Sequence, residues 1–479
     1  MRGVRIVHLG LGGFFRAHQA WYTGAAASRS AASSPGGASL PGGASLPGGA
    51  SLPGAASSPG GASFSGGAGS SADPDADWGI AAFTGRSPGL AKQLSVQDCR
   101  YTLIERGPDR DVLTVQTAVV AAHPGTDLEA LKSYLERPEL AIVTLTVTEA
   151  AYRRNREGGL DVSDPDVRAD RAAVQPGAGT VPVTVPGRLV AGLAARRAAG
   201  TGPLAVVSCD NLPGNGAVTR RVVLDMAEAV PGLAHWIAGN VSFVTTMVDR
   251  ITPRTTPDDV RAVAEQTGWA DAVPVVTEPF TEWVLSGDFP AGRPAWEAAG
   301  ARFVADVHPH EMRKLLLLNG GHSLLAYGGS ARGHETIAAA VSDPVCRGWL
   351  EQWWDEAVRS VPLPADEVAD YRRALLERFA NPRIRHTLAQ IAADGSQKVP
   401  IRVLPVLRAE HAAGRLPAGA VRILAAWIDH LRGIGAPVND AGAAPYQDRA
   451  GSVRDVLGLL APDLADDRAL TDAVEAACR

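Results

Sequence analysis

The feature that most constrains the fold is a glycine-rich turn near the N-terminus. Residues 4–9 read as a short buried strand, a turn with glycines follows, and residues 14–28 have the composition of a helix. The turn glycines are Gly10, Gly12 and Gly13. A strand, a glycine turn and a helix in this order are typical of a dinucleotide-binding unit, in which glycines let the backbone approach a pyrophosphate. Phe15 takes the place of the third glycine of GxGxxG, so a tight turn in any α/β protein is an alternative.

Alternating strand and helix patterns continue to about residue 294. Strands are predicted at 78–83, 101–105, 112–121, 140–147, 204–208 and 243–248, helices at 127–136 and 188–199, and a polar loop at 153–185. This order predicts a Rossmann-type parallel sheet, in which polar side chains just past the strand ends face the ligand crevice. The side chains at such positions are Glu149, Asp210, Asn211 and Asp249.

After residue 294 the pattern changes to long helical stretches with few strand signals. Helices are predicted at 344–358, 367–379, 417–433 and 449–460. The sequence therefore predicts an α/β protein with a Rossmann domain at 1–294 and a mainly α-helical C-terminal domain at 295–479. The hexapeptide PGGASL occurs three times from residue 35, within a Gly/Ser/Ala/Pro tract that ends near residue 77. Three copies with one Leu each cannot bury a core, so we expect 35–77 to be a disordered insertion.

The composition narrows the classes of partner. The formal net charge is -5, and no basic stripe indicates a nucleic-acid or anionic-membrane partner. No run approaches the 18 apolar residues of a membrane helix, and Arg5 and His8 interrupt the apolar N-terminus, so no signal peptide is expected. The four cysteines lie far apart without a CxxC pair, which predicts neither a disulfide framework nor a zinc site. We expect a cytoplasmic protein with a small-molecule ligand and no metal; the oligomeric state stays open.

The apolar stretch at residues 311–329 is interrupted by Lys314, Asn319 and His322. At about 100° per residue these side chains fall near 0°, 140° and 80° on a helix, so one side presents an amine, an amide and an imidazole. Lysine is rare here, with four among the 46 basic residues. A desolvated ammonium can lose its proton and act as a base, whereas a guanidinium stays charged. The alternative is structural: a snorkelling lysine, a capping asparagine and a core histidine.

These residue types fit the oxidation of a secondary alcohol by a nicotinamide cofactor. Neutral Lys314 would take the hydroxyl proton, while Asn211 and Asn319 would donate hydrogen bonds to the oxygen. The end of the second strand, residues 84–87, carries no acid for the adenosine ribose but does carry Arg86. NADP is therefore possible beside NAD, and an exposed loop arginine is the alternative for Arg86.

Several segments together resemble the mannitol dehydrogenase family of polyol-specific long-chain dehydrogenases. They are IVHLGLGGFFRAHQAWYT, VVSCDNLPGNG, TTMVDRITP, EPFTEW and HEMRKLLLLNGGHSLLAYGG. The resemblance covers nearly the whole chain apart from 35–77. Its KxxxxNxxH arrangement is highly characteristic, and GxGxFxRAH, which includes Phe14 and Arg16, is the family's own form of the glycine turn.

The resemblance implies a metal-independent, mostly NAD-linked enzyme. It implies that Lys314 is the general acid/base, that Asn211 and Asn319 form the oxyanion hole, and that His322 binds substrate. It further implies that Asp249 holds substrate hydroxyls. The candidate cofactor-binding residues are Gly10, Gly12, Gly13, Phe14 and Arg16 at the glycine turn, together with Arg86 and Glu149 from the strand-end rule.

Residues 381–402 resemble the family segment that lines the substrate pocket, with Lys398 near its end. Mannitol 2-dehydrogenases tend to carry an arginine eight residues before that lysine; Gln390 stands there, and with His386 it resembles the fructuronate reductase branch. A substrate carboxylate would then meet His386, Lys398, and Arg383 or Arg385. The expected reaction is D-mannonate/D-fructuronate interconversion. The alternatives are a mannitol 2-dehydrogenase, a mannitol-1-phosphate 5-dehydrogenase, or a non-catalytic NAD(P)-sensing protein.

Overall fold

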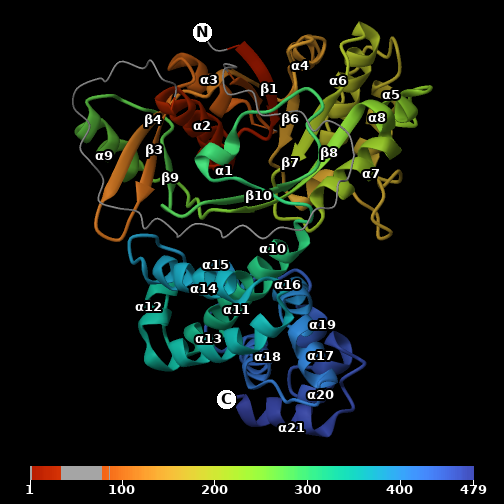
Figure 1. Cartoon of the computed structure of the whole chain (residues 1–479). Coiled ribbons are helices and arrows are strands. Elements are labelled where there is room, and N and C mark those ends of the chain that lie inside the picture. Colours follow the sequence, from red (N-terminus) through yellow and green to blue (C-terminus); the bar gives the residue numbers. More distant parts are fainter. Residues whose placement is uncertain (1–2, 34–77, 86) are drawn as a thin grey trace, which may run out of the picture.

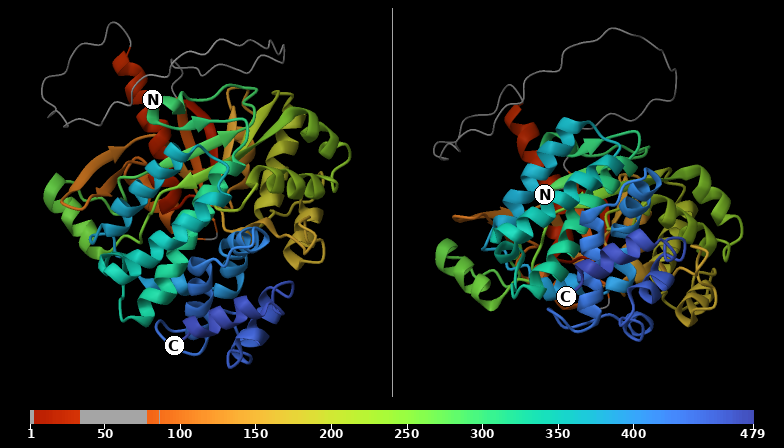
Figure 2. Two further views of the ribbon diagram at one scale, coloured as in Figure 1. Left: turned by 60° about the horizontal axis from the view of Figure 1, so that its bottom comes forward. Right: turned by 90° about the horizontal axis from the view of Figure 1, so that it is seen from below.

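The computed structural model describes residues 3–33, 78–85 and 87–479. The insertion predicted at 35–77 and the cofactor residue Arg86 lie outside the described residues. A sheet-containing part forms the upper half of the molecule in Figure 1, and helices coloured cyan to blue form the lower half. In the view from below, these helices lie in front of the sheet-containing part (Figure 2). Within the described residues, no helix is both long and apolar enough to cross a membrane.

The main sheet has eight strands in the order β11-β10-β8-β7-β6-β1-β2-β5. Their bounds are β1 (Gly3–Leu9), β2 (Trp78–Phe83), β5 (Val119–His123), β6 (Ile142–Leu145), β7 (Leu204–Ser208), β8 (Val241–Asp249), β10 (Glu282–Ser286) and β11 (Arg302–Phe303). The run from β5 to β8 is parallel throughout, whereas β10 pairs antiparallel with β8. This run reproduces the doubly wound order 3-2-1-4-5-6, with its switch point between β1 and β6. The Rossmann prediction is confirmed.

Helices cover both faces of this sheet because its parallel strands are apolar on both sides. They are α1 (Gly13–Ala17), α2 (Gln19–Ser33), α3 (Gly89–Val96), α4 (Leu128–Leu135), α6 (Val185–Ala199), α7 (Asn215–Ala227) and α8 (Leu233–Asn240). Helix α9 (Pro257–Thr267) instead packs against a second sheet, where Val263 contacts Ile104 and Val276. Alternate residues of β1 enter opposite cores: Ile6 packs on the side of α1 and α2, and Val7 packs on the side of α4 and α6. The helix predicted at 14–28 is interrupted at His18, so the structure has two helices there.

Two local predictions in the sheet-containing part were wrong. The strand predicted at 112–121 is two strands, because β4 (Asp111–Gln116) belongs to a second sheet with β3 (Tyr101–Arg106) and β9 (Val275–Thr277). The loop predicted at 153–185 contains helix α5 (Pro165–Ala173) and follows the 3-10 helix η1 (Glu149–Tyr152). Asp164 caps α5 by accepting hydrogen bonds from two backbone amides, and Pro165 occupies its first turn. This helix start is readable in the sequence.

The lower part is helical, as predicted. Its helices are α10 (His308–Arg313), α11 (Gly320–Leu324), α12 (Ile337–Ser342), α13 (Pro344–Ala357), α14 (Ala365–Ala380), α15 (Leu388–Ala392), α16 (Gly395–Arg402), α17 (Leu404–Ala412), α18 (Ala418–Leu431), α19 (Ala444–Gln447), α20 (Val453–Leu460) and α21 (Arg468–Ala477). The short 3-10 helix η5 (Val358–Ser360) follows α13, whereas the 3-10 helix η2 (Trp296–Ala299) packs against α2 in the sheet-containing part. The domain boundary near residue 294 stays a prediction; β11 ends at Phe303 and α10 begins at His308.

The helical segment that carries Lys314, Asn319 and His322, called the reactive helix below, alternates between α and π geometry. Between α10 and α11 lies the π-helix η3 (Lys314–Asn319), and η4 (Leu325–Gly329) follows α11. Two indoles of α13 pack here: Trp353 Nε1 donates to the Leu316 carbonyl and Trp354 Nε1 to the Leu317 carbonyl, both at 2.9 Å. A Cβ at Gly320 would lie 2.7 Å from the Trp353 ring, so glycine is needed for this approach. The expectation of a uniform α-helix is wrong for this segment.

Candidate active site

The glycine turn after β1 fits closely against the neighbouring strand β6. Gly10 has φ +112°, and a Cβ there would lie 2.0 Å from the carbonyl oxygen of Thr146. The amides of Gly10 and Leu11 both donate to the carbonyl of Phe83 at the end of β2, at 2.9 and 2.8 Å. Only glycine satisfies both the backbone angle and the contact. The turn therefore leaves backbone rather than side chain at the switch point of the sheet.

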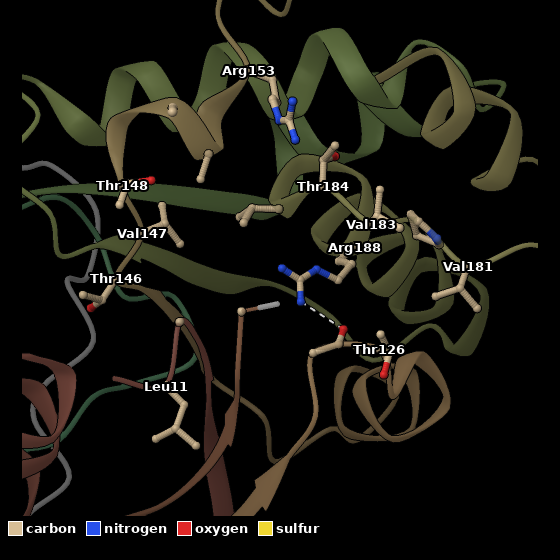
Figure 3. Close-up of a pocket in the computed structure, with 17 residues that line it drawn as sticks. Leu11, Thr126, Thr146, Val147, Thr148, Arg153, Val181, Val183, Thr184 and Arg188 are labelled. Atoms are coloured by element: carbon tan, nitrogen blue, oxygen red, sulfur yellow. Dashed lines mark hydrogen bonds between the residues drawn. The ribbon is translucent and has the colours of Figure 1, made fainter. Parts of the chain in front are cut away.

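A cavity of about 810 Å³ opens at this turn (Figure 3). Its lining comes from the segments after β1, β2, β5 and β6 and from the start of α6: Gly10, Leu11, Gly85, Gly125, Thr126, Thr146, Val147, Thr148, Ala150, Ala151, Arg153, Val181, Pro182, Val183, Thr184, Val185 and Arg188. A cavity at the carboxyl ends of parallel strands, centred on the switch point, is where doubly wound folds bind dinucleotides. The residues present fit a dinucleotide, because the turn at Gly10 has no side chain and leaves its backbone open to a pyrophosphate.

Five described residues that were predicted to bind the cofactor lie outside this lining: Gly12, Gly13, Phe14, Arg16 and Glu149. Gly12 is the N-cap of α1 and Gly13 is its first residue. Arg16 is buried and donates to the carbonyls of Gly12 and Val273, so it holds the glycine turn in place. Phe14 stacks on His18 with ring centroids 5.1 Å apart. Glu149 is 68% exposed and pairs with Arg154 at 2.7 Å. Arg16 and Phe14 therefore support the turn, and Glu149 faces the outer surface beside the cavity.

The sequence analysis missed several residues that line the cavity. Thr146 and Thr148 follow the end of β6, so the strand-end rule that selected Glu149 applied equally to them. Arg188 is 7% exposed and reaches the cavity from α6, where its Nη1 donates to the Gly125 carbonyl at 2.9 Å (Figure 3). No local signal marks Arg188, because the helix pattern around it shows only a position on α6.

A second, smaller cavity of about 70 Å³ brings together three of the predicted catalytic residues. Asn211 after β7, and Lys314 and Asn319 on η3, all line it, together with Asp210 and Glu311. Lys314 Nζ donates to Asn211 Oδ1 at 2.5 Å and to the Val248 carbonyl at 2.6 Å. The amide oxygen of Asn211 accepts this hydrogen bond, so its NH₂ group is left for another acceptor. The Asn211 amide is thus oriented to donate.

The π-helix explains why Lys314 and Asn319 share this cavity. In an α-helix residues five apart differ by about 140°, whereas hydrogen bonds from i to i+5 bring them to about one turn apart. The extra residue in the turn therefore moves Asn319 to the same side as Lys314. Glu311, one α-helical turn earlier, accepts a hydrogen bond from the Gly214 amide at 3.0 Å and ties this helix to the start of α7.

The surroundings of Lys314 favour its neutral form. Burial lowers the pKa of the Lys314 ammonium, and the positive charges of Arg378 and Arg402 act in the same direction. The carboxylate of Asp249 opposes them by raising that pKa. A lysine with a lowered pKa is suited to general acid/base catalysis near neutral pH.

Asp249 is held by protein partners. Its carboxylate accepts two hydrogen bonds from Arg378 on α14, both at 2.8 Å, and one from the Tyr371 hydroxyl at 3.0 Å. Arg378 also binds Glu278, at 2.8 and 2.9 Å. Burial opposes ionisation of Asp249, but Arg378 leaves the pKa of this carboxyl lowered. The contact of Asp249 with substrate hydroxyls stays a prediction. The structure adds that the Asp249 carboxylate raises the pKa of Lys314.

His322 and His386 lie side by side in the helical part. Their ring centroids are 4.9 Å apart, and His322 also stacks on Phe379 at 4.8 Å. Burial lowers the pKa of His386 to about 4 and that of His322 well below its usual value, so both rings are neutral at pH 7. Among the described residues, neither His322 Nε2 nor His386 Nδ1 has a hydrogen-bond partner, although both are buried.

The other residues predicted in the substrate segment are not gathered with this histidine pair. Gln390 is exposed. Lys398 Nζ donates to the carbonyls of Ile391 and Ala393, which holds its own loop. Arg383 pairs with Asp111 at 2.9 Å, and Arg385 is exposed.

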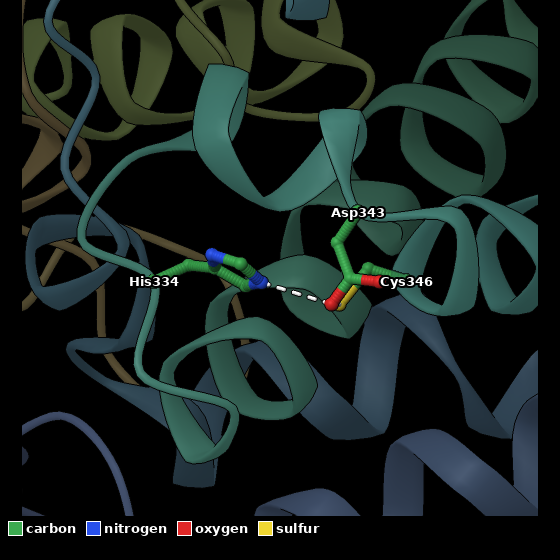
Figure 4. A group of neighbouring side chains, drawn as sticks. All are labelled: His334, Asp343 and Cys346. Atoms are coloured by element: carbon green, nitrogen blue, oxygen red, sulfur yellow. Dashed lines mark hydrogen bonds and ion pairs between the residues drawn. The ribbon is translucent and has the colours of Figure 1, made fainter.

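One group of side chains within the described ranges has the spacing of a metal site. His334, Asp343 and Cys346 offer ligand atoms within 4.8 Å of one another (Figure 4). Asp343 already accepts hydrogen bonds from His334 at 2.9 Å and Arg332 at 2.6 Å, and it caps α13 through the Val345 amide. A guanidinium in contact with the carboxylate opposes a cation there, so the group is best explained as a charged cap of α13.

Comparisons with known proteins agree with this geometry. The model of the mannitol dehydrogenase Rossmann domain matches residues 4–298, and that of the mannitol dehydrogenase C-terminal domain matches residues 306–474. The D-mannonate oxidoreductase of Escherichia coli K12 is 35% identical, over 99% of this chain and 92% of the relative. A mannitol 2-dehydrogenase of Cereibacter sphaeroides is 38% identical, over 78% of this chain and 80% of the relative.

Two solved structures resemble nearly the whole chain. The Pseudomonas fluorescens mannitol 2-dehydrogenase, in a ternary complex with NAD and D-mannitol, aligns with a TM-score of 0.76 and 31% identity, over 99% of this chain and 91% of that one. A substrate-free D-sorbitol dehydrogenase aligns with a TM-score of 0.82 and 28% identity, over 99% and 92%. The chain therefore belongs to the mannitol dehydrogenase family of oxidoreductases.

Proposed function

We propose that this protein is an NAD-dependent dehydrogenase that interconverts a secondary alcohol and a ketone, with D-mannonate and D-fructuronate as its preferred pair. The observation that carries the reaction class is the contact of Lys314 with Asn211 in a cavity that Asn319 also lines. This cavity lies at the ends of β7 and β8, on the same edge of the sheet as the larger dinucleotide-type cavity.

The residues of the site divide the work of proton transfer and charge stabilisation. Bound NAD supplies the acceptor for the hydride that leaves the carbinol carbon. Neutral Lys314 takes the hydroxyl proton during alcohol oxidation, and its ammonium returns a proton to the oxygen during ketone reduction. The Asn211 NH₂ group, turned away from Lys314, and the Asn319 amide donate to the oxygen while it carries negative charge.

The helical side of the site suits a polyhydroxy substrate, and the D-mannonate oxidoreductase relative supports the choice of a sugar acid. Two neutral histidines with unpaired ring nitrogens suit hydroxyls of a polyhydroxy chain. The D-mannonate oxidoreductase relative aligns over 99% of this chain. A mannitol 2-dehydrogenase activity is the second candidate, because the solved mannitol 2-dehydrogenase aligns over the same share of the chain.

The test is a set of initial rates of ketone reduction. NADH and NADPH are each supplied with D-fructuronate, D-fructose or fructose 6-phosphate, and cofactor absorbance is followed. The proposal expects the highest kcat/KM with NADH and fructuronate. A preference for fructose would assign a mannitol 2-dehydrogenase instead. Lys314→Ala should abolish turnover, with Lys132→Ala as the control, since Lys132 pairs only with Glu129 on the surface of α4.

A further inference from the structure

Arg402, the last residue of α16, lies against the helix that carries the reactive residues. Its Nη1 donates to the backbone carbonyl of Asn319 at 3.3 Å and to Ser323 Oγ at 3.1 Å. These two acceptors flank His322 in the sequence. The positive charge of Arg402 also lowers the pKa values of Lys314 and His322, which places the guanidinium within electrostatic reach of both.

This guanidinium has no carboxylate partner within the described part of the chain. Its Nε is buried without a hydrogen-bond partner, and burial lowers the pKa of Arg402 to about 10. Two buried arginines beside Asp249 and the reactive helix are paired with carboxylates: Arg378 binds Asp249 and Glu278, and Arg313 binds Glu282 and Glu367. Arg402 is partly exposed, but its Nε is buried. A charge held partly away from water without a counter-ion is costly to the fold, so one beside a reaction site indicates a charged ligand.

Two further unpaired atoms lie around the same helix. His322 Nε2 and His386 Nδ1 are buried without partners among the described residues, and the two rings are in contact. Buried polar groups are normally satisfied by protein, water or ligand. A cation and two neutral imidazoles, all with unused hydrogen-bonding capacity, match a ligand that carries one anionic group on a hydroxylated chain.

We propose that Arg402 binds the carboxylate of the sugar-acid substrate and so selects it over an uncharged polyol or ketose. The assignment rests on the proposed function. Arg402 takes the place of the residues that the sequence suggested for binding the substrate carboxylate. Lys398 donates to backbone carbonyls, Arg383 pairs with Asp111, and Arg385 is exposed. A guanidinium offers a carboxylate two parallel N–H donors, and Arg402 keeps Nε and Nη2 free for this purpose among the described contacts.

The test compares Arg402→Gln with wild type on D-fructuronate and D-fructose, using NADH. Loss of one charge-assisted contact should lower kcat/KM for fructuronate by about 10- to 100-fold. The value for fructose, which has no carboxylate, should change far less, so the selectivity ratio falls. Arg422→Gln is the matched control, because Arg422 also has a buried unpaired Nε but lies over Trp349, 4.8 Å from the ring centre.

The outcomes separate this inference from the function on which it rests. Wild-type enzyme that fails to prefer fructuronate over fructose refutes the proposed substrate before any variant is made. If wild type prefers fructuronate but Arg402→Gln loses both substrates equally, Arg402 is only a structural support and the inference is wrong. If fructose 6-phosphate is the best wild-type substrate and the variant loses it, the bound anion is a phosphate. Should Arg402→Gln fail to fold, Arg402→Lys keeps the charge and must retain the preference for fructuronate.

Discussion

Replacing Asp249 with asparagine tests whether this carboxylate tunes Lys314 or binds substrate. The change removes one negative charge and keeps the shape of the side chain. Breaking a buried ion pair costs about 3–5 kcal/mol of unfolding free energy. Arg378 keeps its two contacts with Glu278, at 2.8 and 2.9 Å, and Tyr371 can still donate to an amide oxygen. We therefore expect a loss near the lower limit, about 3 kcal/mol.

The same change should move the pH dependence of alcohol oxidation. Asp249 raises the pKa of Lys314 against the lowering effect of burial, so its removal lowers that pKa further. Because neutral Lys314 is the proposed base, we expect oxidation to increase as pH rises through this pKa. The increase should therefore occur at a lower pH in Asp249→Asn. At a pH below both pKa values, the fraction of neutral amine increases by the same factor as the acid dissociation constant, so oxidation should be faster there in Asp249→Asn.

The assay is the pH profile of kcat and kcat/KM for mannonate oxidation, with urea unfolding to measure stability. Glu278→Gln is the matched control, because it disturbs the same arginine without removing the Asp249 charge. It should cost comparable stability and leave the profile nearly in place. An unmoved profile in Asp249→Asn with a greatly increased KM would refute the electrostatic reasoning and support direct contact with substrate hydroxyls. A profile that moves to higher pH would show that the expected sign is wrong.

Three other variants test the remaining parts of the site. Lys314→Arg should keep the melting temperature and NADH binding but lower kcat by about 100- to 10,000-fold, since a guanidinium stays protonated; full activity would exclude the base assignment. Gly10→Ala should lower the unfolding free energy by more than about 3 kcal/mol, because its Cβ would lie 2.0 Å from a carbonyl. Gly13→Ala is the control and should be tolerated, because a Cβ at Gly13 would lie 3.6 Å from its nearest neighbour. Equal urea midpoints for Gly10→Ala and Gly13→Ala would contradict this prediction. Trp353→Phe should cost about 1–3 kcal/mol and lower kcat, because a carbonyl of η3 loses its donor. Trp427→Phe should leave kcat unchanged, because the buried indole nitrogen of Trp427 has no hydrogen-bond partner among the described residues.

The sequence predicted the parts of the fold that depend on local pattern. The glycine turn, the apolar strands and the long amphipathic helices each follow a period that a single segment carries, and these elements were confirmed. The split between β4 and β5 was missed because sheet membership depends on distant partners: β4 pairs with β3, whereas β5 pairs with β2. Arg188 was missed as a cavity residue for the same reason, because nothing in its neighbouring sequence shows what the fold places against it. Arg402 ends the segment 381–402 that resembles the family's pocket lining, but its contacts with Asn319 and Ser323 depend on the fold.

The arrangement of Lys314 and Asn319 shows where local pattern stops determining a site. Their spacing on an α-helix would separate them by about 140°, too far apart to act on one oxygen. The π-helix η3 removes that separation, and its carbonyls at Leu316 and Leu317 are bound by the indoles of Trp353 and Trp354, which lie 37 residues further along the chain. A π turn is intrinsically unfavourable and persists where tertiary contacts support it, often at functional sites. The KxxxxNxxH motif therefore identifies the residues, but packing of α13 gives them a common side, so a variant that weakens this packing can damage catalysis without touching a catalytic residue.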